Sequence, residues 1–186
     1  MDILVAFGLS ASAGLNAYIP LLIVSILARF SNLITLAEPW SALKSWWIIG
    51  LLAVLSILEF FADKVPAVNH VNDAIQTLVR PAAGAILFAA SAKVITDIHP
   101  VISIAAGVLV AGAVHAIKSA AVRPAITATT AGLGSLPMSL AEDVVSTVLS
   151  FLSVVLPVLV GIVLVLLAIW IIWWRAGRKM KTVRRV

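Results

Sequence analysis

The sequence has no cysteine and few charged residues, and both shortages restrict the class of protein. Without cysteine, the chain forms no disulfide framework, thiolate metal site or thiol nucleophile. Charged residues make up 11% of the 186 residues, whereas a soluble domain has about 25%. So few polar side chains cannot cover the surface of a soluble protein, which excludes a soluble globular enzyme and a disordered chain. With 62% hydrophobic residues, the sequence indicates an all-α, polytopic transmembrane protein.

Basic residues are concentrated at the end of the chain. Six of the 13 Lys and Arg residues lie in the last twelve positions: Arg175, Arg178, Lys179, Lys181, Arg184 and Arg185. A basic tail directly after a long apolar run predicts a cytoplasmic end that faces anionic lipid headgroups, and not a nucleic-acid-binding surface. We therefore expect one transmembrane domain, residues 1–174, and a basic cytoplasmic tail, residues 175–186.

Six apolar segments are candidates for crossing a bilayer, whose core needs about 20 helical residues. They are Ile3–Ala28, Trp46–Ala62, Ala82–Thr96, Val101–Ile117, Ser119–Leu140 and Val144–Trp174. The fifth contains Gly132, Gly134 and Pro137, so it is either a broken span or a re-entrant loop. The distribution of Lys and Arg favours six spans with both termini in the cytoplasm, and the alternative is five spans plus a re-entrant loop.

Local patterns predict how some of these segments pack or bend. Gly8, Ser12 and Asn16 recur every four residues, and such a stripe of small side chains lets another helix approach closely. Pro20 predicts a kink in the first segment. The last segment is longer than a bilayer core, so it must tilt, kink at Pro157 or protrude.

The second and third apolar segments are separated by a polar stretch, residues 63–81, which predicts an interfacial or re-entrant helix. Six spans would form two triplets of opposite direction, a 3+3 inverted repeat with broken helices as in many transporters. The sequence support for a repeat is the phrase Arg-Pro-Ala, which occurs at Arg80 and at Arg123. Two such matches in an alanine-rich chain can also arise by chance.

Ionisable residues gather after the second and fourth apolar segments and before the sixth. At membrane depth, charges cost several kcal/mol unless they are paired or hydrated. We therefore expect one hydrated site for a substrate or ion. Its candidate residues are Asn16, Glu59, Asp63, Lys64, Asp73, Arg80, His115, Lys118, Arg123, Glu142 and Asp143.

Each of these candidates also has a structural interpretation. Glu59 and Asp63 can be interfacial, His115 can hydrogen-bond a neighbouring helix, and Lys118 and Arg123 can extend to the headgroups. Glu142 and Asp143 follow Ser139 in the spacing of a helix capping box, and for this pair the structural role is favoured.

Catalytic and cofactor signatures are missing from the sequence. It contains no G-x-S-x-G, H-E-x-x-H or Walker motif, and its three scattered histidines do not suggest a metal site. We expect no cofactor, and an enzymatic activity is not the leading hypothesis.

Two groups of residues resemble a family of small bacterial membrane proteins that is described only as a domain of unknown function. The first group is Glu59-Phe60-Phe61-Ala62-Asp63-Lys64-Val65-Pro66, then Asp73, then Arg80-Pro81-Ala82-Ala83-Gly84. The second is His115-Ala116-Ile117-Lys118, then Arg123-Pro124, then Ser139-Leu140-Ala141-Glu142-Asp143. The resemblance implies a multi-pass protein of the bacterial inner membrane and implies no activity. The threonine-rich stretch Thr127–Thr130 departs from the pattern, which has an Asn there.

The leading functional hypothesis is a small transporter or channel-like protein for a small polar or anionic solute, with proton coupling as an option. A second hypothesis is a non-transporting protein that organises lipids or an assembly, and a third, weaker one is a lipid-headgroup enzyme. The small-residue helix face also predicts a homo-oligomer, with a dimer favoured.

Overall fold

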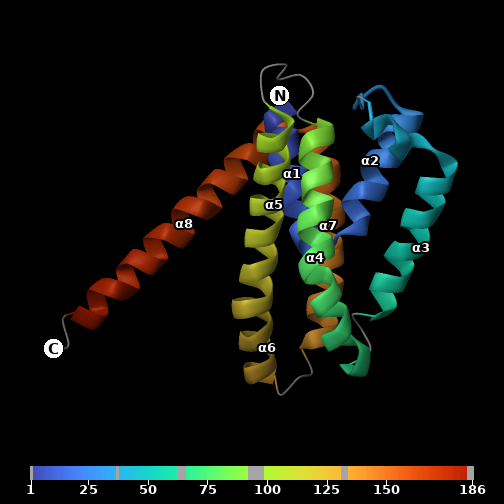
Figure 1. Cartoon of the computed structure of the whole chain (residues 1–186). Helices are drawn as coiled ribbons and strands as arrows, with labels where there is room; N and C mark the ends of the chain where they lie inside the picture. Colours follow the sequence, from blue (N-terminus) through green and yellow to red (C-terminus); the bar gives the residue numbers. More distant parts are fainter. Residues whose placement is uncertain (1, 37, 63–65, 92–98, 131–133, 184–186) are drawn as a thin grey trace.

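The computed structural model describes residues 2–36, 38–62, 66–91, 99–130 and 134–183, and within these ranges it contains helices and no strands (Figure 1). The helices are α1 (Asp2–Leu15), α2 (Tyr18–Phe30), η1 (Trp40–Lys44), α3 (Trp46–Ala62), α4 (Pro66–Ser91), α5 (Pro100–Ile117), η3 (Lys118–Val122), α6 (Arg123–Thr130), α7 (Ser135–Val155) and α8 (Pro157–Val183). The all-α prediction is confirmed for the part of the chain that the structure describes.

Among the described residues, three stretches are long and apolar enough to cross a membrane: Asn72–Ser91, Pro100–Thr130 and Leu136–Val155. Shorter apolar helices accompany them, and many large hydrophobic side chains of the long and the short helices are exposed. An apolar exterior of this kind is what lipid requires of a helical membrane protein. The helix that begins at Trp46 and ends at Ala62 has the predicted bounds.

The first predicted span is wrong, because the chain folds there into two short helices, α1 and α2. Figure 1 shows α1 leading away from the N-terminal end of the bundle and α2 leading back toward that end. With 14 and 13 residues, each helix is about 20 Å long, short of the roughly 30 Å of a bilayer core. The pair is a helical hairpin whose tip, Asn16-Ala17, lies inside the bundle.

The hairpin turns at Asn16 and not at Pro20, where the sequence predicted a kink. The Asn16 side-chain oxygen accepts hydrogen bonds from the backbone amides of Tyr18 (3.1 Å) and Ile19 (3.0 Å), which caps the start of α2. Pro20 has no amide hydrogen to donate to the Asn16 carbonyl four residues earlier. The two residues together end one helix and begin the next.

The polar stretch before Pro81 and the predicted third span form one continuous helix, α4. The two-part prediction is therefore wrong. The helix continues because Gln76 and Arg80 are buried against neighbouring helices, where they find polar partners, instead of facing water. Residues 92–98, which include Lys93 and the end of that predicted span, lie outside the described residues.

The fourth span is confirmed as α5, but the predicted fifth span does not exist as a separate unit. The chain passes from α5 through the π-helical turn η3 into α6 without a loop, and residues 134–140 already belong to α7 or to its N-cap. The described residues of Ser119–Leu140 therefore belong to the end of the α5–α6 stretch and to the start of α7, and residues 131–133 lie outside the described ranges. The two-triplet repeat that depended on these segments is not retained.

The long last segment is divided at Pro157, one of the three outcomes that its length predicted. Leu156 has a non-helical backbone (φ −132°, ψ 60°), and Pro157 begins α8. Figure 1 shows α8 leaving the bundle obliquely toward the end opposite the N-terminus.

α1 lies at the centre of the bundle and packs against α4, α5 and α7. The predicted small-residue stripe is confirmed as a packing face. The Ser12 hydroxyl lies 2.8 Å from that of Ser146 and 2.7 Å from that of Ser150, and a Cβ on Gly8 would collide with Ser153. This face holds the hairpin against α7.

Candidate functional site: a buried charge network at the hairpin tip

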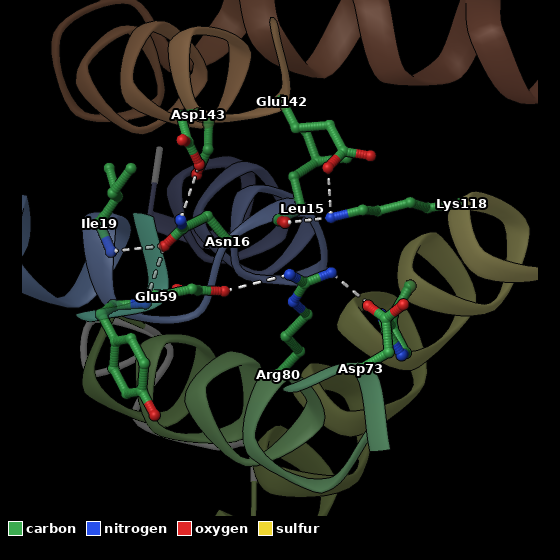
Figure 2. A network of polar contacts seen from close by, with 12 residues as sticks. Leu15, Asn16, Ile19, Glu59, Asp73, Arg80, Lys118, Glu142 and Asp143 are labelled. Carbon is green, nitrogen blue, oxygen red and sulfur yellow. Dashed lines mark hydrogen bonds and ion pairs between the residues drawn. The ribbon is translucent and has the colours of Figure 1, made fainter. Parts of the chain in front are cut away.

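Ionisable side chains from α3, α4, α5, η3, α6 and α7 meet beside the tip of the α1–α2 hairpin (Figure 2). We call this group the charge network. Its members are Glu59, Asp73, Arg80, His115, Lys118, Arg123 and Glu142. Asn16 and Asp143 lie beside it. The structure brings these predicted residues together at one place in the fold.

The deepest part of the network is the ion pair between Arg80 and Glu59. The Arg80 Nη2 atom lies 3.1 Å from Glu59 Oε1, and both side chains are 0% exposed. Arg80 stands near the middle of α4, whereas Glu59 is in the last turn of α3. Since a buried charge without compensation is very costly, this pair joins α3 firmly to α4.

His115 lies between Arg80 and the hydroxyl of Thr77, and both of these residues belong to α4. Its Nδ1 atom lies 3.2 Å from Arg80 Nη1, and its Nε2 atom lies 3.2 Å from Thr77 Oγ1. The Thr77 hydroxyl in turn donates to the Asp73 backbone carbonyl at 2.8 Å. Beside a guanidinium, which only donates, Nδ1 serves as the acceptor and Nε2 carries the hydrogen.

Lys118 begins the π-helical turn and reaches the hairpin tip. Its Nζ atom lies 2.6 Å from Glu142 Oε2 and donates to the Leu15 backbone carbonyl at 2.9 Å. Leu15 is the last residue of α1, so this carbonyl is one of those that a helix end leaves without a partner in its own helix. One ammonium group therefore connects the hairpin to α7.

Arg123 connects two carboxylates at the more open side of the network. Its Nη1 atom lies 2.6 Å from Asp73 Oδ1, and its Nη2 atom lies 3.3 Å from Glu142 Oε2. The Arg123 and Asp73 side chains are 17% and 31% exposed, whereas Glu142 is 3% exposed. The network thus extends from a buried pair to a partly exposed one.

Asn16 holds the hairpin tip to α7 at a second point. Its amide nitrogen donates to Asp143 Oδ1 at 3.0 Å, while its oxygen caps α2. Figure 2 shows this bond and the Lys118–Leu15 bond on the two sides of the tip. The break between α1 and α2 is therefore part of the site.

The charges of the network compensate one another. Arg80, Lys118 and Arg123 each lie within ion-pair distance of a carboxylate. Glu142 accepts from both Lys118 and Arg123 through the same oxygen, Oε2. The arrangement is therefore a set of ion pairs that can exchange partners, and not an open cationic pocket.

The structure corrects the prediction for Glu142 and Asp143. α7 begins at Ser135, with Gly134 at its N-cap, so neither residue lies in the first turn and no capping box forms there. Both side chains instead face the hairpin tip, which the favoured structural interpretation did not predict. The other two candidates, Asp63 and Lys64, lie outside the described residues.

Sequence reasoning missed several polar groups at the site. Thr77 and Tyr18 were not candidates, although Tyr18 follows directly on the break and its side chain hydrogen-bonds to that of Gln76. The Leu15 carbonyl gives no side-chain signal at all. Within the described ranges, no three His, Asp or Glu residues are grouped as a metal site would need.

The helices and the charge network define the class: a helical, membrane-type protein with buried ion pairs around the tip of a helical hairpin. The chain belongs to the family described as "Domain of unknown function (DUF4126)", whose model matches residues 3–176. Neither a curated protein nor a solved structure matches the chain.

Proposed function

We propose that this protein is a small proton-coupled transporter for small polar solutes, anions above all, in the bacterial inner membrane. The observation that carries the proposal is the buried charge network at the tip of the α1–α2 hairpin. Charged groups inside a membrane domain are costly, and they mark ion pathways and substrate sites. Helix breaks beside such groups are typical of transporter binding centres.

The proposed topology has five crossings, α3, α4, α5–α6, α7 and α8, with the α1–α2 hairpin as a re-entrant element. α8, which contains the first part of the basic tail, then ends at Val183 toward the end of the bundle opposite the N-terminus. The positive-inside rule assigns that end to the cytoplasm. In this arrangement Arg80 stands near the middle of the α4 crossing, whereas its partner Glu59 lies in the last turn of the α3 crossing.

The network supplies a route by which protons are coupled to a solute. A proton on Glu142 removes the negative charge that Lys118 and Arg123 share. Both cations then need another anion, because leaving them buried without one is costly. A solute with a negative group can bind at that moment, and its release follows when Glu142 loses the proton.

A flux assay in proteoliposomes tests the proposal. Purified wild-type protein is expected to carry protons together with a solute from a panel of small anions and metabolites, measured with an internal pH dye. Glu59→Gln and Lys118→Ala are expected to lose most of this flux, because each change breaks a buried ion pair.

Gly50→Ala is the matched control, since a Cβ at Gly50 meets no atom within 4 Å. It is expected to transport as the wild type does. Wild-type vesicles that leak no more than empty ones, or variants equal to the wild type, would remove the basis of the proposal.

A further inference from the structure

The two carboxylate oxygens of Glu142 are used unequally: both ion pairs involve one oxygen, which is not expected of a purely structural ion pair. Its Oε2 atom receives both Lys118 Nζ (2.6 Å) and Arg123 Nη2 (3.3 Å). Its Oε1 atom is buried and has no hydrogen-bond partner among the described residues. A buried polar atom without a partner loses its water without replacement, which is unfavourable. Two cations therefore converge on one point that Glu142 fills imperfectly.

The two cations are themselves held in place from elsewhere. Lys118 Nζ is fixed by the Leu15 carbonyl at the end of α1, and Arg123 is fixed through its other nitrogen by Asp73. Removal of the Glu142 carboxylate would therefore leave an ammonium and a guanidinium aimed at the same position. Guanidinium and ammonium groups in such a pair are the donors that bind carboxylates most strongly.

We propose that Lys118 and Arg123 form the binding site for a small monocarboxylate, and that Glu142 occupies this site as an internal substitute for the solute. This inference deepens the proposed function. The role of the site in transport rests on that proposal. A carboxylate is the expected group because the site now holds one, planar and with a single negative charge. Protonation adds a hydrogen to Glu142 Oε1, the oxygen without a donor, and so releases both cations to the solute.

The test replaces the internal carboxylate and offers an external one. In detergent, Glu142→Ala is expected to be less stable than the wild type in chloride-free buffer, and acetate is expected to restore it. At an acetate concentration about a hundredfold above its Kd, the melting temperature is expected to rise by roughly 5–10 °C. Acetamide, which has the same shape and no charge, is expected to have no effect.

Control variants separate the site from general salt effects. Asp143→Ala removes the neighbouring carboxylate of α7, which accepts from Asn16, and it is expected to gain nothing from acetate. Glu142→Ala combined with Arg123→Gln is expected to lose most of the acetate effect. Stabilisation of Glu142→Ala by acetamide as much as by acetate would show a structural void and would overturn the inference.

Two further outcomes are decisive. If Glu142→Ala aggregates in acetamide buffer, the yield of monodisperse protein in acetate buffer replaces the melting temperature as the readout. Aggregation in both buffers counts against the site. Stabilisation by inorganic phosphate but not by acetate would exclude a carboxylate as the ligand. Because the test measures no flux, a positive result together with absent transport would retain the site and reject the transport function.

Discussion

The buried pair of Arg80 and Glu59 allows a sharp prediction about stability. Both side chains are 0% exposed, and the Nη2–Oε1 distance is 3.1 Å. Glu59→Gln keeps the shape of the side chain and removes its charge, so a guanidinium that does not lose its proton is left in the interior. Arg80→Gln leaves a carboxylate there instead.

The expected loss follows from the burial of the pair. Breaking a buried ion pair by removing one partner costs about 3–5 kcal/mol. In a chain of 186 residues, each kcal/mol lowers the melting temperature by about 2–4 °C, so each single variant is expected to melt roughly 6–20 °C lower. The double variant contains no uncompensated charge at this position and is expected to recover much of the loss.

The pH dependence distinguishes the two single variants. In Arg80→Gln, Glu59 no longer faces the guanidinium 3.1 Å away, and protonation of this buried carboxylate removes the charge whose burial is costly. Its folded state therefore regains stability as the pH falls, by up to about 1.4 kcal/mol per pH unit. In Glu59→Gln, the guanidinium stays protonated, so no such recovery is expected.

Thermal unfolding in detergent at several pH values, as a double-mutant cycle, measures these quantities. Losses below about 1 kcal/mol in both single variants, the size typical of exposed pairs, would refute the reasoning. Additive losses in the double variant would also refute it, since residues in contact are expected to be coupled.

Two further changes test the packing and the hairpin. Gly107→Ala is expected to destabilise the protein by about 1–3 kcal/mol, because the new Cβ would lie 2.6 Å from the Ala85 Cα. The control is Gly50→Ala, where no atom lies within 4 Å of the new Cβ and a gain of roughly 0.5–1 kcal/mol is expected. Thermal unfolding compares the two variants, and equal effects would contradict the close helix contact at Gly107. Asn16→Ala removes the cap of α2 and the bond to Asp143 and is expected to cost about 0.5–2 kcal/mol, with faster amide exchange at Tyr18 and Ile19; unchanged exchange there would argue against the capped break.

The helices that sequence patterns predicted well are those whose ends carry local signals. α3 begins at paired tryptophans and α5 at Pro100, and both agree with the prediction to within a residue. The break at Pro157 also follows from the missing amide hydrogen of proline. These features depend on residues close together in the chain.

The errors occurred where a polar side chain found its partner in a distant part of the chain. Residues 63–81 were too polar for a span on hydropathy alone, yet Arg80 and Gln76 are buried in the long helix α4. Glu142 was assigned to a helix cap by its spacing from Ser139, although its partners are Lys118 and Arg123. A hydropathy scale includes the cost of burying a charge. It does not include the favourable interaction with a distant ion-pair partner that offsets this cost.

The direction of a helix was the other quantity that the sequence did not show. The apolar run from Ile3 to Ala28 is long enough for a crossing, and only the structure shows that the chain turns back at Asn16. Asn16 was recognised as part of a packing stripe, and its second role as a helix cap became visible through its bonds to Tyr18 and Ile19.

Composition and hydropathy alone determined that the chain is helical and membrane-type, because a chain with 11% charged residues cannot cover a soluble surface. The sequence also identified most of the charged residues that matter, since a charge in an apolar segment is conspicuous wherever it falls. Which charges pair, and that they do so around the end of α1, depended on the tertiary structure. Ion pairs act over a few ångströms in space, and their partners here are separated by 19–50 residues along the chain.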